Sequence, residues 1–116
     1  MRDELKKLQA VFYRSPSGSE PVREWLKELF PDDRRIVGHD IGLVEFAWPV
    51  GMPACRPLRD GLREVRSNLT DGKNGRVIFC IIQGKMVLLL GFIKKTQKTP
   101  NKNLKLALKR MKDVAS

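Results

Sequence analysis

Basic side chains near the ends of three predicted strands are the strongest candidates for chemistry in this sequence. They are Arg63, Arg66, Arg76, Lys94, Lys95 and Lys98. In an antiparallel meander the end of one strand lies beside the start of the next, so these segments can place their cations around one spot. Such a cluster could bind a phosphate, since Arg holds phosphate oxygens in a bidentate fashion. The simpler alternative is a basic rim exposed to solvent.

Cleavage of an RNA backbone is one reaction that such a cluster could support. The 2′-hydroxyl attacks its own phosphate, so the protein must orient the two groups, stabilise the extra negative charge and help to move protons. A Lys crowded by other cations can have a lowered pKa and share in proton transfer. Glu64 could act as a base or could orient Arg66. No strong acid/base pair is visible, so help from a large RNA partner that bends the substrate would fit.

Other kinds of active site find little support in the sequence. His39 is the only histidine, and Cys55 and Cys80 are not arranged in a CxxC motif, so we expect no metal site and no cofactor. His39 is predicted to be structural or to face solvent, and the two cysteines are predicted to be free thiols. There is no GxxxxGK[ST] or GxGxxG motif for nucleotide binding.

The positive charge is concentrated in the last quarter of the chain. Residues 94–116 hold eight Lys or Arg and one Asp, and so carry +7 of the formal net charge of +10. This balance favours nucleic acid or an acidic protein as the partner. The N-terminal segment has charges where a signal peptide needs an apolar run, and the apolar run 86–93 is far below the ~18 residues that span a bilayer. We therefore expect a cytoplasmic protein without a membrane partner.

The first half of the chain is predicted to form a strand and two helices. A strand is expected over 8–14, followed by a helix with Ser19 as its N-cap. The apolar stripe of that helix is Val22, Trp25, Leu26, Leu29 and Phe30. A second helix, capped by Asp32 or Asp33, runs to about Ala47. Gly38 and Gly42 in it are expected to allow close approach to the first helix, and residues 48–60 are expected to form an extended loop.

The second half is predicted to form three strands and a helix. The strands are expected over 62–69, 76–82 and 86–93, with Gly91 marking a bulge or a close backbone approach. Thr99 is expected to cap a helix that runs to about Val114. If Val65 points into the core, Arg63 and Ser67 share its face, and Glu64 and Arg66 point to the other face of the sheet. That face is expected to be more open than the face covered by the two early helices.

These elements predict one α+β domain over 1–116, with a helical hairpin packed on a mostly antiparallel sheet and a helix at the C-terminus. The last helix allows a different function. It carries Lys102 and further lysines on several faces, so it could lie along a nucleic-acid backbone. A non-enzymatic nucleic-acid-binding regulator is therefore an open alternative. The helix lacks Asn, Gln or Arg at a recognition spacing, which weakens sequence-specific reading of DNA.

Several segments resemble a known family. The run GLREVRSNL…GRVIFCIIQGKMVLLLGFIKKTQKTP, the earlier VFYRSPSGSEPVREWLKEL and the loop WPVGMPACRPL are similar to the HigB-like branch of the RelE/ParE superfamily of type II toxins, which includes phage-derived relatives. The resemblance covers about residues 8–113 and is most specific in GFIKKTQKTP. It implies a curved, mostly antiparallel sheet with a helical hairpin and a C-terminal helix.

The resemblance also implies an activity and partners. The activity is endoribonuclease cleavage of mRNA in the A site of the small ribosomal subunit, without a metal, which stops translation. The partner is a small helix-turn-helix (HigA-like) antitoxin, and operator DNA is bound only through the complex with it. The site positions that match the family are Arg66, Arg76, Lys94 and Lys95, with Glu64 as a further catalytic candidate. RNA contacts are expected from Arg63, Lys98 and Lys102.

One departure from the family pattern affects the expected chemistry. Several members place a Tyr or His near the C-terminus as a catalytic acid or base, whereas this chain has only Tyr13 and His39. ParE relatives use the same fold to poison DNA gyrase, so the fold does not decide the target. The LLGFIKKTQKTP segment favours the branch that cleaves mRNA over a ParE-like gyrase inhibitor.

Overall fold

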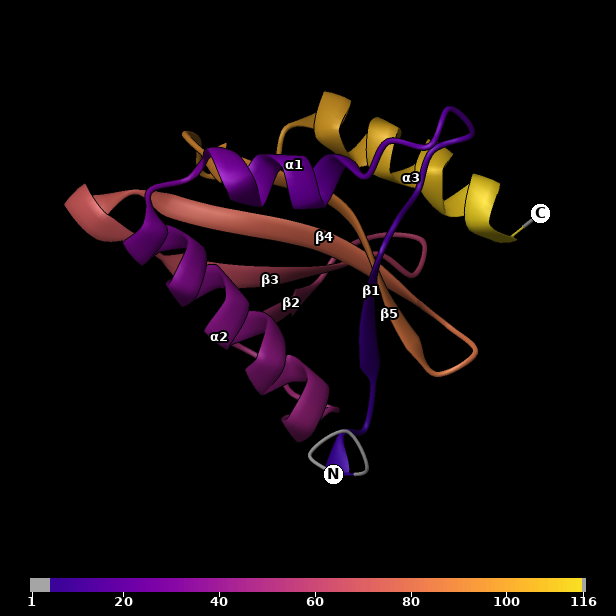
Figure 1. Ribbon diagram of the computed structural model, residues 1–116, viewed down its shortest axis with the longest axis horizontal. Helices are drawn as coiled ribbons and strands as arrows, with labels where there is room; N and C mark the ends of the chain where they lie inside the picture. Colours follow the sequence, from indigo (N-terminus) through magenta and orange to yellow (C-terminus); the bar gives the residue numbers. More distant parts are fainter. Residues whose placement is uncertain (1–4, 116) are drawn as a thin grey trace.

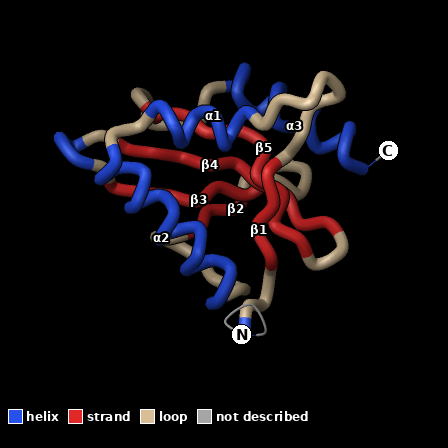
Figure 2. Tube along the Cα trace, viewed as in Figure 1, coloured by secondary structure: helices blue, strands red, loops and turns tan. Residues whose placement is uncertain are grey.

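Five strands and three helices form the computed structural model, which describes residues 5–115 (Figure 1, Figure 2). The strands are β1 (Gln9–Phe12), β2 (Cys55–Pro57), β3 (Arg63–Asn68), β4 (Asn74–Ile82) and β5 (Lys85–Lys94). The helices are α1 (Pro21–Glu28), α2 (Pro31–Ala47) and α3 (Asn101–Ala115), with a short 3-10 turn, η2 (Thr70–Gly72), between β3 and β4. The strands make one sheet in the order β1-β5-β4-β3-β2. β1 pairs parallel with β5, and all other pairs are antiparallel.

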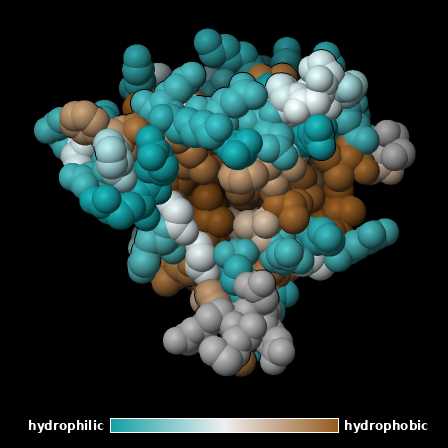
Figure 3. Space-filling view, viewed as in Figure 1, coloured by the Kyte–Doolittle hydropathy of each residue, from teal (hydrophilic) through white to brown (hydrophobic). Residues whose placement is uncertain are grey.

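Helices cover both faces of this sheet. α1 and α2 pack on one face around Val22, Val37, Val44 and Phe79. They diverge from their junction and leave apolar side chains visible between them (Figure 1, Figure 3). α3 packs on β4 and β5 from the other face, around a core that includes Ala107. The predicted α+β class is confirmed, and the second face is less open than expected because α3 lies on part of it.

An extra residue in β5 changes which face the end of that strand presents. Ile78 pairs with Leu90 and Phe79 pairs with Leu88, so Leu89 is a bulge. Successive side chains of a strand point to opposite faces, and a one-residue insertion therefore reverses all later ones. Leu88 packs on the α1/α2 side, whereas Phe92 packs on the α3 side.

Side chains of α3 hold this bulge in place. The Nη1 of Arg110 donates a 2.7 Å hydrogen bond to the carbonyl oxygen of Leu89. The Arg110 guanidinium also lies over the ring of Tyr13, 5.7 Å from its centroid. The Tyr13 hydroxyl in turn donates a 2.9 Å hydrogen bond to Asp113. These contacts fix the register of β5 beneath α3.

The predictions for the glycines are met in part. Of the two alternatives predicted for Gly91, the bulge is wrong, because it lies at Leu89, whereas a close approach is found. A Cβ atom at Gly91 would lie 2.3 Å from Cε3 of Trp25 on α1. A Cβ at Gly38 or Gly42 would meet nothing within 4 Å, so the predicted contact of these two glycines with α1 is wrong. Gly91 thus lets the Trp25 ring lie directly on β5.

The ends of the helices also differ from the predictions. α1 begins at Pro21 after Glu20, and the hydroxyl of the predicted cap Ser19 bonds to Ser15 instead. Phe30 is 68% exposed at the junction of α1 and α2 rather than part of the apolar stripe. Helix α3 begins at Asn101, so Thr99 is not its cap and its hydroxyl is free to bond elsewhere. The predicted loop 48–60 contains the short edge strand β2.

Asp33 ties α2 to the turn between β3 and β4. Its buried carboxylate accepts hydrogen bonds from the backbone N–H of Thr70 at 2.8 Å, from the Thr70 hydroxyl at 2.9 Å and from Lys73 Nζ at 2.9 Å. The backbone bond from Thr70, followed by the bond from Lys73, lowers the pKa of Asp33 below its ordinary value of 3.8. The residue predicted as a helix cap is therefore a tertiary anchor in the first turn of α2.

Removing the charge of Asp33 is expected to destabilise the fold in a pH-dependent manner. A carboxylate whose pKa is depressed in the folded state stabilises fully above its unfolded-state pKa, and this stabilisation is lost as the pH falls through the folded-state pKa. Asp33→Asn should therefore lower the urea midpoint at neutral pH, and its deficit should shrink below pH about 4. The control Asp32→Asn changes an exposed carboxylate that pairs with Arg35 and should leave the midpoint nearly unchanged. A pH-independent deficit would contradict this role of Asp33.

Candidate functional site

Four charged side chains from three neighbouring strands point to the α3 face of the sheet. Arg66 on β3 pairs directly with Arg76 on β4, and Glu64 lies two residues before Arg66. Lys94 pairs with Asn74 at the end of β5, and the bulge at Leu89 turns Lys94 to this face. Without that insertion, Lys94 would point toward the opposite face.

The three cations among them, Arg66, Arg76 and Lys94, border one pocket of about 490 Å³. Its lining residues are Arg66, Asn74, Arg76, Lys94, Lys95, Thr96 and Gln97. β3, β4 and β5 together with the segment after β5 supply all of them. The structure therefore brings together four of the six cations that the sequence predicted to meet, in a hollow with no acidic side chain among its lining residues.

A buried carboxylate lies beside this group of cations. Glu64 is 0% exposed, and its Oε1 lies 3.7 Å from Nε of Arg76, which is itself only 5% exposed. Its Oε2 accepts a 2.7 Å hydrogen bond from the hydroxyl of Thr99. Because a buried charge is stable only with a counter-charge and hydrogen bonds, Glu64 and Arg76 depend on each other. Being fully buried, the Glu64 carboxylate contacts Arg76 and Thr99 and does not line the pocket.

The site holds more positive charge than Glu64 neutralises. Burial lowers the pKa of Arg76, as do Arg66 and Arg56, while Glu64 raises it. Burial likewise lowers the pKa of Lys94; Glu64 raises it, and the three arginines lower it. Lys94 is thereby moved toward the range in which an amine can both take up and release a proton. The uncompensated charge favours an anionic ligand.

Three nitrogen and oxygen atoms in this group have no hydrogen-bond partner among the described residues. They are Glu64 Oε1, Arg66 Nε and Arg76 Nε. Buried polar atoms are almost always hydrogen-bonded in native proteins, so each such exception calls for an explanation. Glu64 Oε1 and Arg76 Nε lie 3.7 Å apart as an ion pair, which leaves the guanidinium of Arg66 as the group with a donor to spare for a bound phosphate.

Arg56 is a member of the cluster that the sequence did not reveal. It lies on β2 directly opposite Glu64 and contributes to the electric field at Arg76 and Lys94. β2 has three residues and ends in Pro57, which is too short to show an alternating pattern. Thr99 was also missed, because its place before a proline predicted a helix cap rather than a bond to Glu64.

Three predicted RNA contacts lie outside the pocket. Arg63 is on the opposite face, because neighbouring side chains of β3 alternate, and its guanidinium lies 4.9 Å from the ring centroid of Trp48. The inclusion of Arg63 with Arg66 is therefore wrong. Lys98 and Lys102 are exposed and do not line the pocket, so their contact with RNA stays a prediction. Lys95 does line it.

Other predicted features can be located as well. Cys55 and Cys80 are free thiols, as predicted, and burial raises the pKa of both. The side chain of His39 is 78% exposed on α2, which fits the solvent-facing role predicted for it. Between residues 5 and 115, no three His, Cys, Asp or Glu side chains gather where they could hold a metal ion. Over the same residues, no helix is long and apolar enough to cross a membrane.

The arrangement of three helices and a mixed five-stranded sheet is compatible with the RelE-like fold, and its sheet gathers cations in one hollow. The model of the family described as "Phage derived protein Gp49-like (DUF891)" matches residues 24–112. The chain therefore belongs to the Gp49-like family, a RelE/ParE-type toxin family. Membership of a toxin-antitoxin family suggests an antitoxin as a partner. No curated protein matches the chain.

Removing the charge of Glu64 is expected to change the titration of Lys94. Glu64 raises the pKa of Lys94, so Glu64→Gln should lower that pKa further, while glutamine keeps an oxygen that can accept the Thr99 bond. NMR titration of the Lys94 side chain measures this. The matched control Asp60→Asn removes an exposed carboxylate that pairs with Arg59, and should leave the Lys94 pKa unchanged. An unchanged or raised pKa in Glu64→Gln would show that Glu64 is not the counter-charge of this site.

Proposed function

We propose that this protein is a HigB-like toxin of a type II toxin-antitoxin system that cleaves translated mRNA on the ribosome. The observation that carries the proposal is the convergence of Arg66, Arg76 and Lys94 in one pocket beside buried Glu64. A pocket with excess positive charge fits a phosphate group in the RNA backbone. Membership of the Gp49-like family supports the toxin part of the proposal.

The reaction is an attack of the RNA on itself. The 2′-oxygen forms a bond to the adjacent phosphorus while the bond from phosphorus to the 5′-oxygen of the next nucleotide breaks. A proton leaves the 2′-hydroxyl, and another is delivered to the departing 5′-oxygen. The products are a 2′,3′-cyclic phosphate and a 5′-hydroxyl end. The protein has to place these groups in line and stabilise the additional charge on the phosphate oxygens.

We assign a role in this reaction to each charged residue from its position and its neighbours. Arg66 and Arg76 are paired across neighbouring strands and both line the pocket, so we assign them to the phosphate oxygens. Lys94 has a lowered pKa and lines the same pocket, so we assign it to proton transfer. Lys95 adds positive charge at the pocket's edge. Glu64 is a positioning residue because it is fully buried.

The composition of the pocket supports the proposed dependence on the ribosome. Neither Tyr13 nor His39 lines it. The Tyr13 hydroxyl is engaged with Asp113, and burial raises its pKa. The pocket has no strong acid/base pair, so cleavage should be fastest when a partner holds the mRNA in a bent geometry. The ribosomal A site would be such a partner. A HigA-like helix-turn-helix antitoxin would neutralise the toxin, and operator DNA would be bound through their complex.

Loss of Lys94 is expected to abolish cleavage without unfolding the protein. Removing a general acid or base costs about 10²–10⁴ in rate, so Lys94→Ala should reduce mRNA cleavage by that factor. The control Lys109→Ala removes one charge from an exposed position on α3 and should cut mRNA at nearly the wild-type rate. Each variant is induced alone in cells, and the 5′ ends of mRNA are mapped together with growth and protein synthesis.

The same experiment distinguishes the competing functions. Arrest of translation with new 5′ ends inside codons supports the proposal. A DNA-damage response with intact mRNA would identify a gyrase inhibitor instead. Binding of DNA by the isolated chain without toxicity would identify a regulator. If Lys94→Ala cuts mRNA as well as Lys109→Ala does, the proposed site is misassigned.

A further inference from the structure

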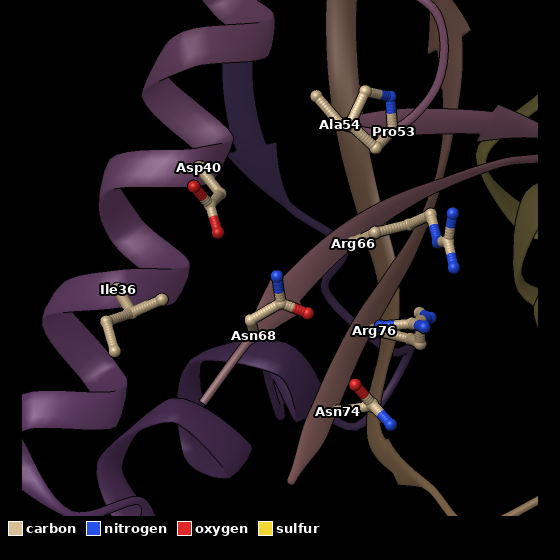
Figure 4. Close-up of a pocket in the computed structure, with 8 residues that line it drawn as sticks. All are labelled: Ile36, Asp40, Pro53, Ala54, Arg66, Asn68, Asn74 and Arg76. Atoms are coloured by element: carbon tan, nitrogen blue, oxygen red, sulfur yellow. The ribbon is translucent and has the colours of Figure 1, made fainter. Parts of the chain in front are cut away.

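A second hollow adjoins the cationic pocket. It has a volume of about 560 Å³ and lies between α2 and the ends of β3 and β4 (Figure 4). Its lining residues are Ile36, Asp40, Pro53, Ala54, Arg66, Asn68, Asn74 and Arg76. Arg66, Asn74 and Arg76 line both hollows, so the two are halves of one groove with the arginines between them.

The short length of β2 opens this second hollow. β2 pairs only with residues 63–65, so the remainder of β3 up to Asn68 has no neighbouring strand on that side. The backbone N–H of Arg66 still bonds to the carbonyl oxygen of Ala54, which holds the preceding loop at the rim. α2 closes the other side with Ile36 and Asp40, whose side chains extend toward the strands (Figure 4).

We propose that this second hollow binds the guanine base of the nucleotide whose 3′-phosphate occupies the cationic pocket. This inference rests on the proposed function, because it assumes an RNA substrate. The 560 Å³ volume is in the range of pockets that hold small ligands. The second hollow shares Arg66 and Arg76 with the cationic pocket, so the two hollows are direct neighbours. A base and the 3′-phosphate of the same nucleotide need two such neighbouring sites.

The lining of the hollow suits a flat ring with polar edges. Ile36, Pro53 and Ala54 supply apolar surface against which the faces of a base can pack. Asn68 and Asn74 face each other as a cross-strand pair, and their amides can both donate and accept hydrogen bonds. Asp40 supplies a carboxylate, 27% exposed, which can only accept when ionised.

The carboxylate of Asp40 gives the hollow a preference among bases. Guanine presents two adjacent N–H donors, N1–H and N2–H, on one edge, and a carboxylate with two oxygens can accept both. Adenine has a ring acceptor at the corresponding position, which would face the carboxylate with lone pairs opposed. Cytosine and uracil offer a single donor there and a smaller apolar face. Asp40 should therefore favour guanine and disfavour adenine.

The arginines where the two hollows meet support an occupied groove. Arg66 Nε has no hydrogen-bond partner among residues 5–115, whereas Arg76 Nε lies 3.7 Å from Oε1 of Glu64 and Arg76 is only 5% exposed. Arg66 and Arg76 line both hollows. A nucleotide lying across the groove would place its phosphate at these guanidinium groups while its base enters the second hollow.

Binding of mononucleotides to the isolated protein tests this inference without requiring cleavage. The probes are guanosine 3′-monophosphate, adenosine 3′-monophosphate and inorganic phosphate, followed by NMR of backbone and side-chain amides. Phosphate should shift residues of the cationic pocket such as Thr96. Guanosine 3′-monophosphate should also shift Asn68 and Asp40, and should bind about tenfold more tightly than the adenosine nucleotide, a difference of about 1.4 kcal/mol.

Variants of two aspartates on α2 complete the test. Asp40→Asn should remove the preference for the guanosine nucleotide and leave the affinity for phosphate unchanged. Asp32→Asn is the control, because Asp32 lies on α2 but does not line this hollow, and it should keep the preference. Equal binding of both nucleotides by the parent, shifts confined to the cationic pocket, or a preference that survives Asp40→Asn would each overturn the inference. Guanine binding by a chain that cuts no mRNA would instead refute the proposed function alone.

Discussion

The charge of one buried carboxylate is the constraint on which the candidate site depends. Glu64 is fully buried, 3.7 Å from the guanidinium of Arg76 and bonded to Thr99. A buried charge of this kind is costly unless a counter-charge and hydrogen bonds surround it. Glu64 therefore draws Arg76 into the sheet and, through Thr99, draws the segment after β5 over it. The cations that remain in excess, Lys94 among them, face the pocket and leave it ready for an anion.

Backbone geometry brings the charges to the same face. The cross-strand pairing of Arg66 with Arg76 follows from the register of the β3–β4 hairpin, whose turn is held by buried Asp33. Lys94 reaches this face only because Leu89 is inserted in β5, and Arg110 on α3 binds the carbonyl oxygen of that inserted residue. α3 thus acts on the site from a distance, by fixing the register of the strand that carries Lys94. The packing of α3 and the geometry of the candidate site are linked through this contact.

Much of this arrangement could be predicted from the sequence, since apolar runs and turn residues gave the β3–β4–β5 meander and the apolar stripe of α3. The alternation of side chains around Val65 placed Glu64 and Arg66 together and put Arg63 on the opposite face, which argued against grouping Arg63 with them. The bulge at Leu89 could not be foreseen, because three consecutive leucines fit either register. Arg56 could not be predicted for another reason. It lies on β2, whose three residues are too few to show an alternating pattern and form a strand only by pairing with β3.

A double-mutant cycle between Glu64 and Arg76 tests the central claim most directly. Urea unfolding would be measured for the parent, Glu64→Gln, Arg76→Met and the double variant, with circular dichroism to confirm the fold of each. If Glu64 holds the cations through its charge, the double variant should lose less unfolding free energy than the sum of the losses of the two single variants. The difference, the coupling energy, should be about 1–3 kcal/mol. Single losses that add to within about 0.5 kcal/mol would contradict the account, because Glu64 and Arg76 would then be buried independently of each other.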